Sequence, residues 1–523
     1  DEPDVVKGIA GSFYAVRDYF DVSPDYAINA ANRLAEFDAL VERVHRAGMK
    51  ALIDFVPNHV ARGYQSVVRP EINFGEGDDK SKFFSPNNHL FYLVDPPGQR
   101  LELARPPHWH PPGLTFSGLY AREDGAPGRV PKVTGNNAAT SRPSAFDWYE
   151  TIKINYGYNF IDQTGHYTPR PRTWDLMDQI LAYWQSRGVD GFRCDFAHYV
   201  PAEAWAHLLG QARSRDSDAY FFAEAYPYAG SGDPVTDMQA LVDVGFDAVY
   251  HDNSYNHLKR IYQSTGSQDD YNDAMVSVPA AQRAHYVEYL ENHDERRVAS
   301  PVVQGVGQGE SGFGTMKAGY LLAPLQYLYG SGPVLLLNGQ EVGEPGDGFE
   351  GYGGEDGRTT LFDYWSMPAF VKWVNNHRFD GGQLSEAQKS LRVFYEGLLR
   401  LCQDPSVRGS EYWGLKYFNR LEAYGDCPAS LYTFARYHPQ SGRMLVVAGN
   451  FDRANEASGQ IRLPSELIAA AGMAERCAIK LSLDHNGIHE RAIGVATSES
   501  LEKDGFEVTV LAETCHVYVL ETA

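Results

Sequence analysis

Acidic residues, an arginine and two histidines are concentrated in four short segments of this 523-residue chain. The segments read Asp-Phe-Val-Pro-Asn-His at 54–59, Gly-Phe-Arg-Cys-Asp at 191–195, Phe-Ala-Glu-Ala at 222–225 and Glu-Asn-His-Asp at 291–294. Cleavage of a glycosidic bond needs a carboxylate nucleophile and a carboxylic acid that are held close together. These residue types therefore predict nucleophilic and acid–base chemistry on a sugar.

Parallel strands are predicted to position these groups. The stretch at 50–56 is almost continuously apolar, as in strands that are buried on both faces, and it follows a helix predicted over 30–49. Strand and helix patterns alternate again after residue 165, with strands ending near residues 195, 223, 251, 290 and 337. We therefore predict an α/β fold of the (β/α)8 TIM-barrel type, which gathers residues from distant parts of the chain at one rim.

Composition divides the chain into three predicted domains. Residues 1–59 and 166–406 form the barrel, and residues 60–165, rich in Pro, Gly, Asn and aromatics, form an inserted irregular domain. Residues 407–523 show short alternating runs between turns, which predicts an all-β domain. Six barrel strands are apparent where eight are needed, so the first two strands are predicted to be missing from this chain.

Bulk properties exclude several classes of partner. The formal net charge of −22 disfavours nucleic acid and anionic membranes, and it is compatible with a neutral substrate or a bound cation. No apolar run reaches the roughly 18 residues of a membrane helix, and residues 1–4 resemble no signal peptide, so a soluble chain is expected. The Cys and His residues show no metal-ligand spacing, and the sequence carries no signal for compartment or oligomeric state.

The four segments, in this order, resemble the signature regions of the α-amylase superfamily of retaining α-glucan hydrolases and transglycosylases. Gly-Pro at 332–333, Gly-Gln-Glu at 339–341 and Phe-Asp-Tyr-Trp at 362–365 extend the resemblance, which runs from about residue 11 to the end. It implies a barrel, a domain inserted after the third strand, and a β-sandwich at the C-terminal end.

The resemblance also implies catalytic roles. Asp195 would be the nucleophile, Glu224 the general acid and then the general base, and Asp294 a third carboxylate that holds the ring hydroxyls. Arg193 stands two residues before Asp195, so it points the same way along a strand and would keep that carboxylate ionised. Asp54 is expected to pair with Arg193 or to order the rim.

Further residues are expected to bind the substrate. His59 and His293 would hydrogen-bond the sugar, and Tyr14 would stack on it. His198 would either shape the acceptor side or cap the following helix. Asn58 matches a calcium-binding position of the family, so a structural Ca²⁺ is one expectation, although no cofactor is required for the chemistry.

These assignments predict an enzyme that hydrolyses α-1,4-glucans or maltooligosaccharides through a covalent glycosyl-enzyme. Glucosyl or maltosyl transfer by the same residues is the first alternative, and a non-catalytic binding relative is the second. A metal-dependent hydrolase would use the Asp and His residues, but it has no ready use for Arg193 beside a cation.

Overall fold

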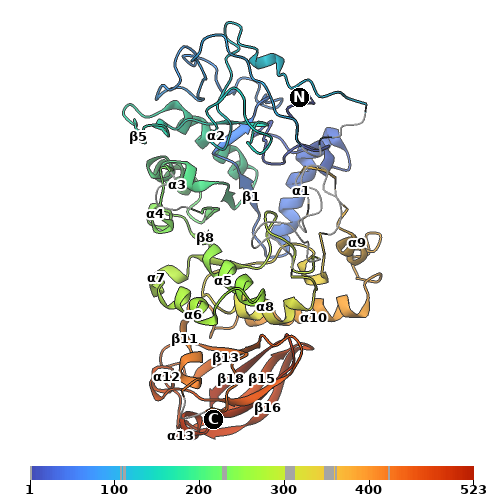
Figure 1. Ribbon diagram of the computed structural model, residues 1–523, viewed down its shortest axis with the longest axis vertical. Helices are drawn as coiled ribbons and strands as arrows, with labels where there is room; N and C mark the ends of the chain where they lie inside the picture. The colour runs from blue at the N-terminus through green and yellow to red at the C-terminus, as the bar shows by residue number, and fades with distance from the viewer. Residues whose placement is uncertain are drawn as a thin grey trace. The chain divides into compact units, whose positions relative to one another are not determined.

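The computed structural model describes residues 3–106, 109, 113–226, 232–300, 313–346, 359, 362–364, 366–421 and 425–523. The chain divides into two compact units. The first comprises residues 1–249, 351–353 and 361–364, and the second comprises residues 250–350, 354–360 and 365–523. Figure 1 labels the helices and strands of both units.

The first unit is built on a parallel sheet whose strands alternate with helices. Its strands are β1 (Leu52–Phe55), β6 (Gly191–Cys194), β7 (Tyr220–Ala223) and β8 (Ala248–Tyr250), paired in this order. The helices are α1 (Arg33–Arg46), α2 (Arg172–Ser186), α3 (Ala202–Arg215) and α4 (Met238–Val244), each of which precedes one of these strands. These strands, and α1 before the first of them, lie where the sequence predicts them.

Apolar spacing explains two of these helices. In α2 the apolar face formed by Trp174, Met177, Leu181 and Trp184 is buried throughout. In α1 only Val41 is fully buried, and the helix ends just before a glycine at position 48 with φ +75°, a conformation that favours glycine.

The segment 60–165 contains little regular structure among its described residues, as predicted. β2 (His59–Ala61) pairs antiparallel with β3 (Thr151–Lys153), β4 (Tyr158–Asn159) pairs with β5 (Thr164–Gly165), and one short helix, η3 (Ala121–Glu123), lies between. Small apolar clusters and a fully buried ion pair stabilise it. In that pair, Arg62 Nη1 lies 2.5 Å from Glu123 Oε2.

No strand precedes β1 in the described part of the chain. Residues 3–51 hold turns, α1 and two short helices, η1 (Pro24–Tyr26) and η2 (Ala30–Asn32). The absence of the first two barrel strands from the chain stays a prediction, and so do the three domain boundaries.

The second unit begins with further strand–helix repeats. β9 (Tyr286–Tyr289) pairs in parallel with β10 (Val334–Leu335). The larger helices are α5 (Asp252–Tyr262), α6 (Gln268–Val276), α8 (Ala318–Tyr327) and α10 (Glu386–Leu401), and the shorter ones are α7 (Ala280–Arg283), η5 (Gln340–Val342) and α9 (Pro368–Val374). A capping box opens α10, because the Ser385 side chain and Gln388 bond reciprocally.

An antiparallel β domain completes this unit. Six strands form one sheet, in the order β11 (Glu411–Gly414), β12 (Leu431–Tyr437), β13 (Arg443–Asn450), β18 (Cys515–Thr522), β15 (Arg476–Asp484) and β16 (Gly487–Thr497). β14 (Ala457–Ile461) pairs with β17 (Phe506–Val510), and α11 (Lys416–Asn419), α12 (Ser465–Ala470) and α13 (Ser498–Lys503) connect the strands. All five cysteines of the chain are free.

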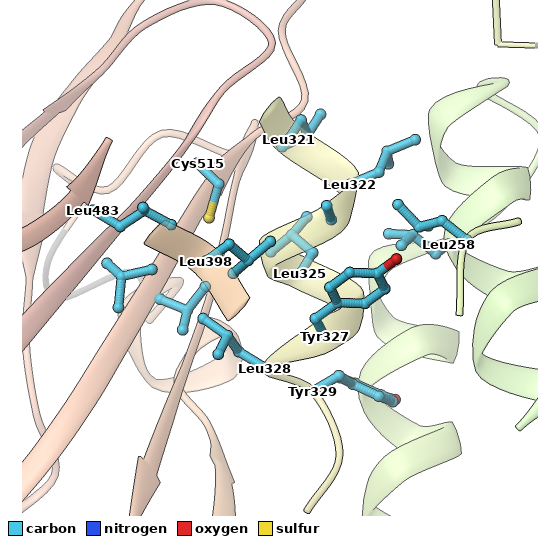
Figure 2. Close-up of a cluster of buried hydrophobic side chains, with 14 of the residues drawn as sticks. Leu258, Leu321, Leu322, Leu325, Tyr327, Leu328, Tyr329, Leu398, Leu483 and Cys515 are labelled. Carbon is cyan, nitrogen blue, oxygen red and sulfur yellow. The ribbon is translucent and has the colours of Figure 1, made fainter. Parts of the chain in front are cut away.

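Both faces of the six-stranded sheet are buried at its centre, whereas the edge strand β16 is largely exposed. Along β13, Leu445 and Val447 join a core with α8 and α10, whereas the alternate residues Val446 and Ala448 join a second core with β14 and β17. Figure 2 shows the first core, where Leu483 and Cys515 of the sheet face Leu398 of α10. In the described part of the chain, no helix has the length and apolarity needed to cross a membrane.

Candidate active site

An arginine cluster, formed by Arg193, Asp54, Asp195 and Glu224, lies at the carboxyl ends of β1, β6 and β7. Asp54 and Arg193 are register partners on neighbouring parallel strands, so their side chains stand side by side. Arg193 Nη1 donates to Asp54 Oδ1 at 2.9 Å and to Asp195 Oδ1 at 2.7 Å. Its Nη2 lies 3.2 Å from Glu224 Oε2, without the alignment of a hydrogen bond. One guanidinium thus contacts three carboxylates, and the expected pairing of Asp54 with Arg193 is confirmed.

Strand alternation explains which side chains reach this cluster. The parallel ladder continues one residue beyond the strands, because Asp195 N–H donates to Phe55 O and Glu224 N–H donates to Cys194 O, both at 2.9 Å. Arg193 and Asp195 therefore share one side of the sheet, while Cys194 points to the other. Burial raises the pKa of the Cys194 thiol well above its usual value, so this residue is inert core.

The backbone that follows β6 holds Glu224. Phe196 N–H donates to Glu224 Oε2 at 2.9 Å, and Ala197 N–H donates to the Glu224 carbonyl oxygen at 2.9 Å. Phe196 has φ 45°, in the left-handed region that residues with a side chain rarely adopt. The turn thereby aims its N–H at the Glu224 carboxylate, which is buried.

Charge compensation decides the state of the arginine cluster. Burial acts to lower the pKa of Arg193, but the charges of Glu224, Asp195 and Asp54 outweigh it and raise that pKa well above its usual value. A guanidinium that stays charged stabilises the ionised forms of the carboxylates around it. The contacts with Arg193 thus favour the ionised forms of Asp195 and Glu224.

Tyr14 and His59 flank the arginine cluster. Arg193 Cζ lies 5.5 Å from the centroid of the Tyr14 ring, and the His59 side chain bonds to the Tyr14 backbone. Burial, and then the charge of Lys153, lowers the pKa of His59 to about 3. His59 is therefore neutral near pH 7 and offers hydrogen bonds without adding charge to the site.

Asn58, the predicted calcium ligand, is occupied by protein groups. Its side-chain oxygen accepts a hydrogen bond from Lys153 Nζ, and its amide nitrogen donates to Gly135 O at 2.8 Å. Lys153 is buried on β3 directly opposite His59, with its amine 4.6 Å from the centroid of the Tyr199 ring. A metal ion at Asn58 would have to displace this amine. The described residues around Asn58 therefore do not fit a calcium ion.

His198 lies in η4 (Ala197–Tyr199), which follows β6 and Asp195. Its ring stacks on Phe196 with centroids 5.5 Å apart, and its buried Nδ1 has no hydrogen-bond partner in the described chain. Burial, and then the charge of Lys153, lowers the pKa of His198 to about 4. α3 begins after Pro201 and has no side-chain cap, so the alternative that His198 caps this helix is wrong.

Asp294 and His293 lie in the second unit, after β9. The Asn292 side-chain oxygen accepts two consecutive backbone N–H groups, beginning with that of Asp294, at 2.9 Å each. This turn places His293 Nε2 3.1 Å from Asp294 Oδ2. Just before it, buried Glu291 accepts a hydrogen bond from Arg297 Nη1 at 2.9 Å. The convergence of Asp294 and His293 with the arginine cluster stays a prediction.

Three residues around the site escaped the sequence analysis: Tyr19, Trp148 and Lys153. The Trp148 ring packs edge-on against His59 and Phe196, with centroids 5.5 and 4.7 Å apart. The Tyr19 hydroxyl donates to the His59 carbonyl oxygen at 3.1 Å. A signal for Lys153 existed, since the alternating Thr-Ile-Lys-Ile at 151–154 is typical of a short strand.

Known proteins share this architecture. The model of the α-amylase catalytic domain matches residues 9–372. Maltase 1 of Drosophila virilis is 28% identical over 190 residues, which are 36% of this chain and 23% of that protein. An α-amylase of Streptomyces lividans is 23% identical over 468 residues, covering 84% of this chain and 46% of that protein. The crystal structure of an α-amylase from Lactobacillus plantarum aligns with a TM-score of 0.56 and 17% identity, covering 98% of this chain and 87% of that one.

The parallel sheet, the acidic groups at its strand ends and the β domain after it define a TIM-barrel protein of the kind that carries its site at the C-terminal face. The match to the catalytic-domain model covers well over half of the sequence. The chain belongs to the α-amylase family, and it has the family's barrel fold with a C-terminal β domain. It spans less than half the length of the two curated relatives.

Proposed function

We propose that this chain is a retaining glycosidase of α-linked glucans, with Asp195 as the nucleophile and Glu224 as the acid and base. The arginine cluster carries this proposal, because two buried carboxylates at neighbouring strand ends share one guanidinium. Retaining enzymes hold the two carboxyl groups roughly 5–5.5 Å apart, on either side of one glycosidic bond. Membership of the α-amylase family supports the choice of an α-glucan.

In the first displacement, an Asp195 oxygen attacks the anomeric carbon while Glu224 gives its proton to the departing glycosidic oxygen. Glu224 must be protonated at this moment, yet Arg193 and the Phe196 N–H both stabilise its ionised form. We expect a bound sugar to separate Glu224 from Arg193 and to exclude water, which makes the charged form more costly. Asp195 keeps its hydrogen bond to Arg193 and remains an anion.

In the second displacement, the Glu224 carboxylate takes a proton from a water molecule or a sugar hydroxyl. The resulting oxygen attacks the anomeric carbon, the bond to Asp195 breaks, and Asp195 leaves as an anion. Each displacement inverts the anomeric carbon, so the product keeps the α configuration. The nature of the attacking oxygen alone separates hydrolysis from transfer.

Other residues would position the sugar. Tyr14 would stack on the ring that enters the site, and neutral His59 would bond a hydroxyl. His293 would hydrogen-bond the sugar, and Asp294 would hold its ring hydroxyls and favour the distorted, positively charged transition state. His198 has an unpaired buried nitrogen beside the nucleophile segment, which suits it to a polar group on the acceptor side.

Alternative functions are supported less well. Glucosyl or maltosyl transfer uses the same residues and differs only in the acceptor. A purely binding role leaves the buried Arg193 cluster without a use, although such a cluster is costly to maintain. A metal-dependent hydrolase would need a cation where the Arg193 guanidinium already contacts the carboxylates.

We also propose that the site needs no divalent cation at Asn58. Lys153 Nζ bonds the only side-chain oxygen that Asn58 could offer, and an amine donates such a bond whether or not it is protonated. The amine then does locally what an oxygen-bound cation would do, which is to tie β2 to β3.

Incubation with maltotriose and longer maltooligosaccharides tests the proposed function. Shorter products that are first released as the α-anomer would support hydrolysis with retention, and products longer than the substrate would support transfer. The anomer is followed by NMR before mutarotation. No product from any α-glucan, or release of the β-anomer, would overturn the retaining mechanism.

A further inference from the structure

A second cluster of polar side chains lies in the β domain of the second unit. Asp484 ends β15, His485 is in the two-residue turn that leads to β16, His489 is in β16, and His516 is in β18. These four residues are called the histidine cluster. Asp484, His485 and His516 each offer one ligand atom, and the three atoms lie within 4.8 Å of one another.

A β-bulge brings the carboxylate and the imidazole to the same face of the sheet. Leu481 pairs with Tyr518 but Leu483 pairs with Val517, so β15 holds one extra residue at this point. Leu483 and Val517 then point together into the core that β15 shares with α10. The next residues along the two strands, at positions 484 and 516, consequently turn together to the opposite face.

Two of the histidines have buried nitrogen atoms without a partner. His516 is only 7% exposed, and its Nε2 makes no hydrogen bond within the described chain, while its Nδ1 lies 3.2 Å from the Tyr518 hydroxyl. The buried Nδ1 of His485 is likewise unpaired. A buried polar atom without a partner is destabilising and calls for an explanation, of which an ion is one.

The carboxylate is already oriented. Asp484 Oδ1 accepts the Asn486 N–H at 2.7 Å and lies 2.8 Å from His489 Nε2. Outer groups of this kind hold the ligands of a metal site in place.

We propose that Asp484, His485 and His516 bind a divalent transition metal of the Zn²⁺ class, with His489 as the residue that positions the carboxylate. Two imidazole nitrogens and one carboxylate oxygen suit zinc, whereas calcium and magnesium prefer oxygen ligands throughout. Ligand atoms around tetrahedral zinc stand about 3.3 Å apart, so the three groups must close by about an ångström. His485 is in a turn, which permits such a movement.

The bound ion would connect the β15–β16 turn to the centre of the sheet. β18 lies between β13 and β15. A metal that joins His516 to the turn would therefore link the β15–β16 edge of the sheet to a central strand. We therefore assign the site a structural role. A water molecule would complete the coordination, and catalysis would not depend on it.

Zinc titration of the full chain tests this proposal. The protein is stripped with a chelator, dialysed, and titrated with Zn²⁺ against a chelating dye, alongside Asp484→Asn, His485→Asn and His489→Asn. His438→Asn is the matched control, since it removes a histidine of the same domain outside the cluster. We expect one Zn²⁺ per chain, at least about 100-fold weaker binding in the first two variants, and roughly 10–100-fold weaker binding in His489→Asn.

Two further measurements make the result decisive. Co²⁺ in place of zinc should give the visible absorption of a four-coordinate site, and zinc should raise the Tm of the wild type and of His438→Asn but not of Asp484→Asn. Because Asp484 and His485 are near the surface turn, their variants are expected to fold even if a His516 variant does not.

Equal zinc affinity in wild type and Asp484→Asn, or no stoichiometric binding by the wild type, would overturn the proposal. The Asp195→Asn variant should bind zinc normally, so failure of this site and failure of the glycosidase assignment are separate results.

Discussion

The arginine cluster and the histidine cluster bury charge in opposite ways. Around Arg193 a single cation meets three carboxylates, and every acidic group of the cluster contacts it. Around Asp484 a single carboxylate meets imidazoles, two of which keep an unpaired nitrogen within the described chain. The first cluster has an excess of negative charge and its cation is built in, whereas the second has lone pairs and no cation of its own.

This difference suggests what each cluster can accept. An excess of carboxylates around a fixed guanidinium is suited to a neutral ligand on which positive charge develops, such as a sugar in its oxocarbenium-like transition state. Unpaired lone pairs beside one carboxylate are suited to a small cation from solution. If this comparison is right, substitutions in the first cluster remove turnover, and those in the second remove metal binding and leave turnover intact.

The largest effect is expected from the two carboxylates of the proposed chemistry. Asp195→Asn removes the nucleophile and Glu224→Gln removes the proton donor and acceptor, so each should lower kcat by at least about 10³-fold. Initial rates on maltooligosaccharides measure this. Asp190→Asn is the matched control, because Asp190 lies at the opposite end of β6, where it bonds Lys50 at 2.9 Å. Turnover of purified, folded Asp195→Asn near the wild-type level would contradict the assignment.

Substitutions of Arg193 are expected to have a smaller effect on turnover and, in addition, an effect on stability. Arg193→Lys keeps a charge but loses the fork that reaches Asp195 and Glu224 together, and we expect kcat to fall about 100-fold, equivalent to about 2.7 kcal/mol. Arg193→Leu leaves three carboxylates without a counter-charge and should lower the free energy of unfolding by about 3–5 kcal/mol. Denaturant unfolding and initial rates are measured on the same samples. A stable, fully active Arg193→Leu protein would show that the cluster is not built around this cation.

The arginine cluster was predictable because its signals are local in sequence. Arg193 and Asp195 share a strand face by simple alternation, and the ends of neighbouring parallel strands bring Asp54 and Glu224 to them. The predicted strands ending at residues 195, 223, 251 and 290 all appear, with ends shifted by about one residue. The apolar stretches that specify them need no knowledge of distant contacts.

The histidine cluster was not predictable for the converse reason. Simple alternation along β15 from Leu481 would put Asp484 on the face opposite to that of Leu481, away from His516. Only the bulge between Leu481 and Leu483 turns Asp484 to the same face as His516. Lys153 escaped for a similar reason, because its position opposite His59 depends on the register of two three-residue strands. Both residues depend on pairings between segments whose own patterns are too short to fix a register.

A pH dependence of stability should distinguish the buried His198, which follows β6, from exposed histidines. Because the pKa of His198 is lowered to about 4 from 6.5, the unfolded chain binds a proton in this range that the folded chain does not. The contribution of neutral His198 to the free energy of unfolding is therefore fully present above pH 6.5 and is lost as the pH falls toward 4. At pH 5 this loss lowers the free energy of unfolding by about 2 kcal/mol. The group that faces His198 is Lys153 on β3, whose positive charge acts in the same direction.

Urea unfolding of the wild type and His198→Gln at pH 7 and pH 5 measures this contribution. From pH 7 to pH 5, the free energy of unfolding of the wild type should fall by about 2 kcal/mol more than that of His198→Gln. His166→Gln, which replaces an exposed histidine of the same unit, should behave like the wild type. An acid response in His198→Gln equal to that of the wild type would mean that His198 is hydrated or paired in the folded protein.

The smallest expected effect separates the two clusters most cleanly, because it is an absence of response at one of them. Chelation with EDTA, followed by addition of Ca²⁺, should leave kcat and KM unchanged within error, since the Lys153 amine already bonds the Asn58 oxygen. The same treatment should remove zinc from the histidine cluster and lower the Tm, so each sample reports on both regions at once.

Burial lowers the pKa of Lys153 to about 7. The test is therefore run at pH 6, where the amine is mainly protonated, and at pH 8, where it is mainly neutral. Calcium activation at either pH would mean that Lys153 leaves Asn58 in solution, and Lys153→Met, which cannot donate the bond, should then bind calcium more tightly. Unchanged kinetics at both pH values, together with a zinc-dependent Tm, would place the metal requirement of this chain in the β domain alone.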